Sequence, residues 1–213
     1  FRVARNHRTS QAHRDICLIT GAYVLLHEVE KSKVLLNRAT ADLQHILPGK
    51  NLITAFAMFY SAQLNSAMKK YPSAEIMFKY AHNTFLKQLG NDNLMLASCL
   101  NELALLAGRN NKYKSAVPFE EKALHIYTQI FGEDTPRLAP PLCNMAYMYT
   151  RAGQPEKAVA AYLKALQLYE RTSNKAYEVE IARTSANLAA LYGRMKQQAK
   201  AKAYGEKALA LCN

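Results

Sequence analysis

The sequence has 213 residues, and half of them are apolar, so the chain can bury a continuous core and disorder is not expected. Its 28 Lys and Arg against 16 Asp and Glu leave a formal charge of +12, which fits either an anionic partner or a solvated basic exterior. Helix-forming residues dominate, Gly and Pro are few, and strand-like alternation of Val, Ile and Thr is missing. We therefore predict an all-α chain.

The N-terminal residues 1–14 carry four arginines and no acid. They are too short for a pair of helices and are interpreted as the end of a preceding helix. The chain begins with Phe1 rather than Met, so an upstream signal peptide or domain stays open and the compartment is unknown, with the cytoplasm favoured. No apolar run reaches the roughly 18–20 residues of a membrane-spanning helix, so a soluble chain is expected.

From residue 15 onward the sequence repeats itself. The stretch KAVAAYLKAL at 157–166 has counterparts at 31–40, 72–82, 114–124 and 199–209. One small residue is shared by all five copies, at successive separations of 42, 42, 42 and 43 positions, and two further registers of small residues lie seven positions after it and twelve before it. The three registers are Ser32, Ala74, Ala116, Ala158 and Ala201; Ala39, Ala81, Ala123, Ala165 and Ala208; Thr20, Ala62, Ala104, Ala146 and Ala189.

Each copy is predicted to hold two helices joined by a short turn and followed by a linker. Turn-forming residues lie in KKYPS at 69–73, GRNNKY at 108–113 and RAGQPE at 151–156. The linkers LGNDN at 89–93 and FGEDTP at 131–136 supply Gly just past one helix and an acidic or amide cap before the next. We expect a single solenoid over 15–213, with approximate units 15–48, 52–90, 94–132, 136–171 and 178–213.

The recurring alanines follow from close helix crossing. Where two helices cross closely, the residue at the crossing must be small, and larger apolar side chains fill the space around it. Ala146 is therefore expected to face Ala158, with Tyr149, Tyr162 and Leu166 packed around them.

This pattern resembles the tetratricopeptide repeat family. Small Ala146, aromatic Tyr149, Ala158 and aromatic Tyr162 fall in the family's order and spacing, and the pattern recurs over nearly the whole chain. A period of 42 rather than about 34 residues is similar to the longer-helix variety in kinesin light chains. The resemblance implies a right-handed superhelical α-solenoid of about five helix-turn-helix repeats, whose first helices line a concave groove. Glu120 departs from the pattern, because it occupies the position that the aromatic Tyr162 holds in the following unit.

The predicted groove carries amide and cationic side chains. Arg109, Arg151 and Arg194 occupy one position in three consecutive units, and Arg183 joins them. The resemblance implies that Asn amides hold a ligand backbone and cations receive its carboxylates, because an amide both donates and accepts and Arg binds a carboxylate with two parallel bonds. The alternative is that these arginines only complement helix C-termini. The predicted partner-binding residues are Asn144, Asn187, Arg109, Arg151, Arg183, Arg194, Tyr147 and Glu102.

No catalytic, cofactor or metal site is predicted. The six histidines lie in different units without a partner four residues on, and the four cysteines are far apart with no CxxC pair, which favours unpaired thiols over a zinc site and leaves a disulfide open. The motifs of serine hydrolases, P-loop enzymes, zinc peptidases and dinucleotide-binding enzymes are missing. We therefore expect no enzyme.

The leading interpretation is a non-catalytic scaffold that binds a peptide segment of a partner protein, extended or helical and of acidic character, in the concave groove. A second is the sensor domain of a larger regulatory protein, in transcription or signalling. A third is a self-associating assembly module, because Leu209 and Leu211 leave an apolar end on the last helix. Nucleic acid is a less favoured partner, because the chain lacks the interleaved basic and aromatic residues of single-strand binders.

Overall fold

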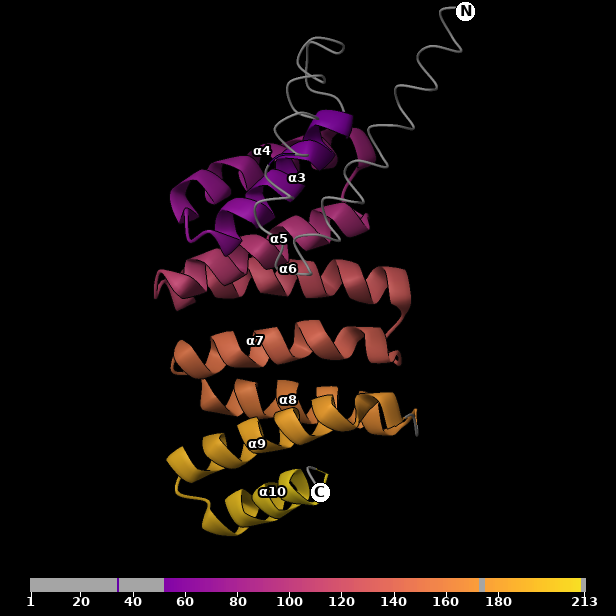
Figure 1. The fold of residues 1–213 in the computed structure, drawn as a ribbon. Coiled ribbons are helices and arrows are strands. Elements are labelled where there is room, and N and C mark those ends of the chain that lie inside the picture. The colour runs from indigo at the N-terminus through magenta and orange to yellow at the C-terminus, as the bar shows by residue number, and fades with distance from the viewer. Residues whose placement is uncertain (1–33, 35–51, 173–174, 212–213) are drawn as a thin grey trace, which may run out of the picture. The chain divides into compact units, whose positions relative to one another are not determined.

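The computed structural model describes residue 34, residues 52–172 and residues 175–211 (Figure 1). The basic segment 1–14 and, apart from Val34, the predicted unit 15–48 lie outside these residues. Within the described ranges every regular element is a helix, which confirms the predicted all-α class. The elements are α3 (Leu52–Ala67), α4 (Tyr71–Leu89), α5 (Leu94–Arg109), α6 (Tyr113–Phe131), η1 (Pro136–Leu138), α7 (Ala139–Arg151), α8 (Pro155–Glu170), η2 (Lys175–Tyr177), α9 (Glu178–Arg194) and α10 (Gln198–Ala210).

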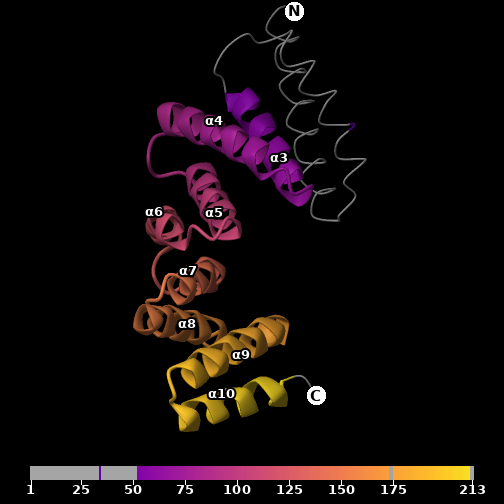
Figure 2. The ribbon, with the colours of Figure 1, turned by 90° about the vertical axis from the view of Figure 1, so that its left-hand side faces the viewer.

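The chain divides into two compact units, residues 1–106 and 107–213, which are described separately. In the first unit α3 packs against α4. In the second, α7 packs against α8 and α9 against α10, and Figure 2 shows these pairs as successive hairpins. The single solenoid over 15–213 stays a prediction.

The four turns inside the helix pairs share one backbone pattern. Lys69, Asn111, Gly153 and Lys196 all have positive φ, between 57° and 78°. In each turn the next amide donates back across the helix end, as Gln154 N does to Tyr149 O at 2.9 Å, which closes the last turn of the helix. The repeat seen in the sequence is therefore also a repeat of backbone hydrogen bonds.

The linkers end and start helices largely as predicted. Gly90 and Gly132 follow α4 and α6 with φ of 81° and 79°. Asn93 caps α5, because its Oδ1 accepts from Leu96 N at 2.8 Å. In the second linker the cap is not the predicted acid. Arg137 N donates to the hydroxyl of Thr135 at 3.4 Å, while Asp134 pairs with Arg171 at 2.8 Å.

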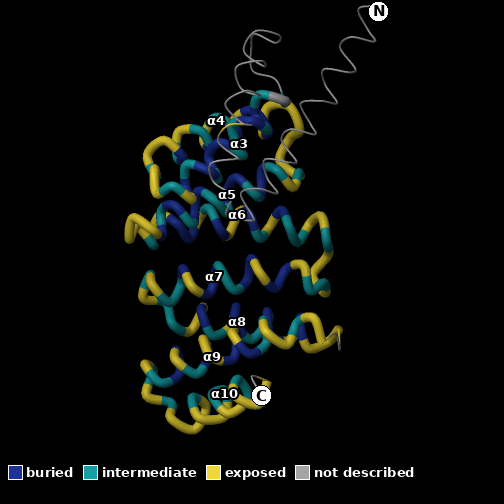
Figure 3. Tube along the Cα trace, in the orientation of Figure 1, coloured by how far each residue is buried: buried dark blue, intermediate teal, exposed yellow. Residues whose placement is uncertain are grey.

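Most of the recurring alanines are buried, as the repeat predicts. Nine of them are fully buried in the described units up to α8, and Figure 3 shows buried positions recurring along the helices α3 to α9. Ala146 and Ala158 share one core with Tyr162 and Leu166, against which Tyr149 packs. The nine are Ala62, Ala74, Ala81, Ala104, Ala116, Ala123, Ala146, Ala158 and Ala165.

Larger side chains complete each core. In the first unit the ring of Phe59 meets that of Phe78 edge-on, with centroids 5.5 Å apart. In the second unit Leu138, Leu142 and Tyr169 pack around Ala165 between α7, α8 and η1. Glu120 of α6, which departs from the repeat pattern, is also buried and has no exposed surface. Both units therefore hold their helices by small residues at the crossings and aromatic or aliphatic residues around them.

Candidate functional site

One side of α7 is left uncovered by the core. Asn144, Tyr147 and Arg151 follow each other at spacings of three and four residues, which puts them on one side of the helix. Asn144 is half-buried, Tyr147 is 46% exposed, and Arg151 is exposed. Met145 and Met148, on other sides of the helix, are buried. The core of this unit therefore uses the opposite side of α7.

The same side of α9 is also uncovered. Arg183, Asn187 and Arg194 are exposed at spacings of four and seven residues, whereas Leu188 and Leu191 are buried. Asn187 and Arg194 lie 43 positions after their counterparts on α7. The two helices thus present equivalent residues in the same register.

α7 and α9 contact each other directly. The thiol of Cys143 on α7 lies 3.5 Å from the hydroxyl of Thr184 on α9. Burial raises the pKa of this thiol, while the Thr184 hydrogen bond and the charge of Arg183 act in the opposite direction. We call the uncovered sides of these two helices, which meet at this contact, the α7/α9 face. It consists of Asn144, Tyr147, Arg151, Arg183, Asn187 and Arg194.

Two tyrosines support Arg151 at one end of this face. Its guanidinium carbon lies 4.9 Å from the centre of the Tyr113 ring, and the Tyr113 and Tyr147 rings meet edge-on at 6.1 Å. The pKa of Tyr113 is lowered mainly by its hydrogen bond with Tyr147 and next by its hydrogen bond with Arg151. The same Tyr113–Tyr147 hydrogen bond raises the pKa of Tyr147. Arg151 is therefore held by aromatic neighbours and still open to solvent.

The sequence prediction missed Tyr113. It is the first residue of α6, and the prediction considered only positions on the first helix of each pair. A signal was present in the repeat. After the turn that follows the Arg109 position, Tyr113 stands at the same place as Tyr71 in the preceding copy. The start of each second helix lies beside the end of the first, so its side chain can reach the same surface.

The three repeated arginines each end a helix. Arg109, Arg151 and Arg194 are the last residues of α5, α7 and α9. A Cβ added to Gly108 would lie 3.1 Å from Met148 Cε, so the end of α5 touches α7 within the second unit. These arginines can therefore also complement the helix dipole at the C-terminus of each helix. In that role their side chains would still be exposed to solvent.

The charge along this surface is one-sided. α7 contains no acid, and Arg151 is its single charged residue. On α9 the acids Glu178 and Glu180 lie in the first turn, before Arg183. A ligand that crosses the later turns of both helices therefore meets cations and amides.

Glu102 lies in the first unit and has a partner there. Gln63 of α3 donates from Nε2 to Glu102 Oε1 at 3.0 Å, which links α3 to α5. Glu102 was predicted to bind a partner in the groove. Glu102 therefore stabilises the contact between neighbouring helices, and its place among the partner-binding residues stays untested.

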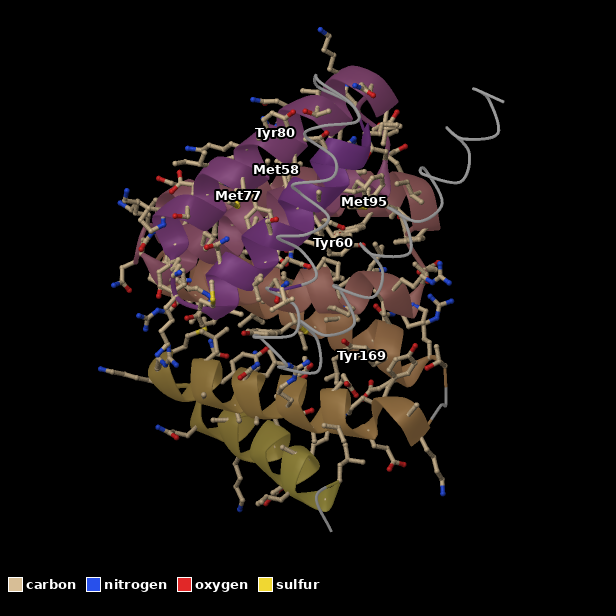
Figure 4. All side chains as sticks on the ribbon, turned by 45° about the horizontal axis from the view of Figure 1, so that its top comes forward. Met58, Tyr60, Met77, Tyr80, Met95 and Tyr169 are labelled. Carbon is tan, nitrogen blue, oxygen red and sulfur yellow. The ribbon has the colours of Figure 1, made fainter. Side chains whose placement is uncertain are left out.

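Several other features of the described ranges lie outside the α7/α9 face. Groups of three or more His, Cys, Asp or Glu that could hold a metal ion are absent from the described residues. The Tyr169 hydroxyl is buried without a hydrogen-bond partner, between the helices of the second unit (Figure 4). Leu209 is 68% exposed on α10, which has no buried residue. Of the helices described, none is long and apolar enough to cross a membrane.

Sequence profiles described as tetratricopeptide repeat match residues 96–137, 121–171 and 137–213. The search of curated proteins gave no significant match. Among solved structures, BtubC (BKLC) from P. vanneervenii is 18% identical with a TM-score of 0.84, over 99% of this chain and 84% of that chain.

Two further structures show the same fold. A Podosopora anserina protein of kinesin light chain type, with nearly identical TPR-like repeats, is 18% identical with a TM-score of 0.77, over 93% of both chains. YrrB, a TPR protein with an unusual peptide-binding site, is 14% identical with a TM-score of 0.63, over 95% of this chain and 91% of that one. At such identities the likeness establishes the fold and leaves the ligand of this chain to its own residues.

Proposed function

Because the chain belongs to the tetratricopeptide repeat family, as its repeat predicts, we propose that it is a non-catalytic protein-interaction module. It binds a peptide segment of a partner protein on the α7/α9 face, and the segment is acidic. The observation that carries this proposal is the exposed cation at equivalent positions of two contacting helices, Arg151 and Arg194.

The chemistry of the face supports an acidic ligand. Arg binds carboxylates through two parallel charge-assisted bonds, which gives the contact a defined geometry as well as a favourable charge. No acid of α7 competes for Arg151, and the Tyr113 ring restricts its motion, so less conformational entropy is lost on binding. Asn187 adds an exposed amide that both donates and accepts.

The test is a charge reversal of the two arginines. Labelled peptides of about twelve residues, one rich in Glu and one rich in Lys, are titrated with the protein at low and high salt, and fluorescence anisotropy reports binding. The Glu-rich peptide should bind and weaken with salt, and Arg151→Glu with Arg194→Glu should weaken it at least about tenfold.

A matched variant separates the face from the general charge. Lys122→Glu with Lys202→Glu makes the same change in net charge at exposed positions of α6 and α10. This variant should bind the Glu-rich peptide as the unchanged protein does. Equal losses in both variants would mean that the basic charge acts from everywhere on the surface, and the proposal would be wrong. Circular dichroism confirms that each variant keeps its helices.

A further inference from the structure

We propose that the α7 part of the α7/α9 face binds two neighbouring side chains of the ligand, an acid at Arg151 and an aromatic ring at Tyr147, whereas the α9 part binds an acid alone. This inference rests on the proposed function and adds a second chemical requirement to it. It follows from contacts around one end of α7 and from the residues at the equivalent positions of α8 and α9.

Tyr147 is placed beside Arg151 by the helix itself. The two residues lie four positions apart on α7, so their Cβ atoms lie roughly 5–6 Å apart on one side of the helix. Both also contact Tyr113. The guanidinium carbon of Arg151 lies 4.9 Å from the centre of the Tyr113 ring, and the rings of Tyr113 and Tyr147 meet edge-on at 6.1 Å. A ligand whose acid reaches Arg151 therefore brings its neighbouring side chains within reach of Tyr147.

The polar end of Tyr147 is already used. The hydroxyl of Tyr113 donates to Oδ1 of Asn111 at 3.2 Å, so in its hydrogen bond with Tyr147 it accepts. These bonds hold the Tyr147 ring in place, so less conformational entropy is lost when a ligand packs against it. The side chain is still 46% exposed. What Tyr147 offers to a ligand is therefore its ring rather than its hydroxyl.

An aromatic side chain suits this position better than an aliphatic one. Two aromatic rings that pack edge-to-face gain more than the burial of their area supplies, because the positive edge of one ring meets the negative face of the other. Tyr and Arg are also the residue types that anchor many protein interfaces. The α7 part of the face joins one of each, and it therefore matches a ligand in which an aromatic residue lies close to an acid.

The α9 part of the face has the cation without the rings. Ala190 stands 43 positions after Tyr147, as Arg194 does after Arg151, and it is exposed. Pro155 begins α8 at the position where Tyr113 begins α6. The repeat thus keeps the arginine in both copies and the aromatic pair in one. The aromatic residue of the ligand should therefore bind at α7.

Three labelled peptides of about twelve residues test this pairing. Each is rich in Glu, and its central residue is Trp, Leu or Ala. Anisotropy titrations at low salt give the Kd of each peptide for the unchanged protein and for Tyr147→Ala. With the unchanged protein, the Trp peptide should bind at least about threefold more tightly than the Ala peptide, and the Leu peptide should lie between them. Tyr147→Ala should remove this difference.

Leu209→Ala is the matched control. Leu209 is 68% exposed on α10, outside the α7/α9 face, so this variant also loses an exposed apolar side chain but should keep the preference for Trp. The protein contains no Trp, so tryptophan emission reports the ligand alone. Binding should shift this emission to shorter wavelength with the unchanged protein and with Leu209→Ala, and by less with Tyr147→Ala. Circular dichroism confirms that both variants keep their helices.

The outcomes separate the two proposals. Equal Kd values for the Trp and Ala peptides would overturn the aromatic subsite and leave the proposed function standing. A Leu peptide that binds as tightly as the Trp peptide would overturn the preference for an aromatic ring. A preference for Trp that survives Tyr147→Ala, or that Leu209→Ala removes equally, would overturn the role of Tyr147. Failure of every Glu-rich peptide to bind would overturn both proposals.

Discussion

The guanidinium of Arg151 lies over the ring of Tyr113, 4.9 Å from its centre, although the two residues belong to different helices. This contact joins the end of α7 to the start of α6, which belongs to the preceding helix pair. It gives Arg151 a support that a lone surface arginine lacks, because the ring attracts the cation and limits the rotamers of its side chain.

Removal of this support should weaken acidic ligands. We expect Tyr113→Leu to weaken binding of the Glu-rich peptide about two- to fivefold, because a cation–π contact at an exposed site is a modest interaction. Tyr113→Phe keeps the ring and should lose less. Tyr204→Leu is the control, because the Tyr204 ring of α10 stacks on the Tyr192 ring of α9. A loss of similar size at Tyr204 would contradict a specific role for Tyr113.

The buried alanines should tolerate no enlargement. Ala158 has no exposed surface and lies in the core with Ala146 and Tyr162, so Ala158→Leu should lower the free energy of unfolding by about 1–3 kcal/mol. Ala160 is exposed on the same helix, and Ala160→Leu should change the free energy of unfolding by no more than about 0.5 kcal/mol. Urea unfolding followed by circular dichroism measures both. Similar midpoints for the two variants would show that Ala158 is not at a close crossing.

Two glycine substitutions should act in opposite directions. Gly153 has a φ of +78° with open space around its Cα, so Gly153→Ala adds no clash and should lower the free energy of unfolding by about 1 kcal/mol through backbone strain alone. Gly193 lies inside α9, also in open space, and Gly193→Ala should raise the free energy of unfolding by up to about 1 kcal/mol. Lys196 has a positive φ at the corresponding turn, so Lys196→Gly should raise the free energy of unfolding by about 0.5 kcal/mol. Thermal melts of the three variants test the set, and a gain from Gly153→Ala would contradict the strain.

Alkaline pH should destabilise the second unit through its buried tyrosines. Burial raises the pKa of Tyr162 from 10 to about 12, because the phenolate is disfavoured away from water. The folded state therefore holds a proton that the unfolded state releases, and the stability from this difference is complete below pH 10 and is lost between pH 10 and 12. Urea midpoints measured over this range should fall, and Tyr162→Phe should make the fall shallower. An unchanged slope in that variant would assign the effect to other groups.

Most of the fold could be predicted from the sequence because it depends on local rules that repeat. The alanine registers gave the helix crossings, and Gly90, Asn93 and Gly132 gave helix ends through their backbone preferences and hydrogen bonds. The prediction of the second linker was wrong in its cap. Thr135 and Asp134 can both cap a helix, and in the structure Thr135 does so while Asp134 pairs with Arg171, a residue far along the chain.

The candidate site was less accessible to sequence reasoning because it depends on pairs from different helices. The positions of Arg151 and Arg194 followed from the repeat alone. Tyr113 was missed, because its contact with Arg151 depends on how the start of one helix lies beside the end of another. The bond between Gln63 and Glu102 was also missed, because the two residues lie 39 positions apart and only their proximity in the fold shows that they bind each other.

The recurring turn bonds also imply that the protein can be lengthened in whole steps. A tandem duplication of residues 110–151 would insert 42 residues and repeat every turn hydrogen bond in register. The enlarged chain would have one additional arginine in its row, between those of α7 and α9. Its preferred peptide should then need a further acid, so the number of repeats would set the length of the partner segment.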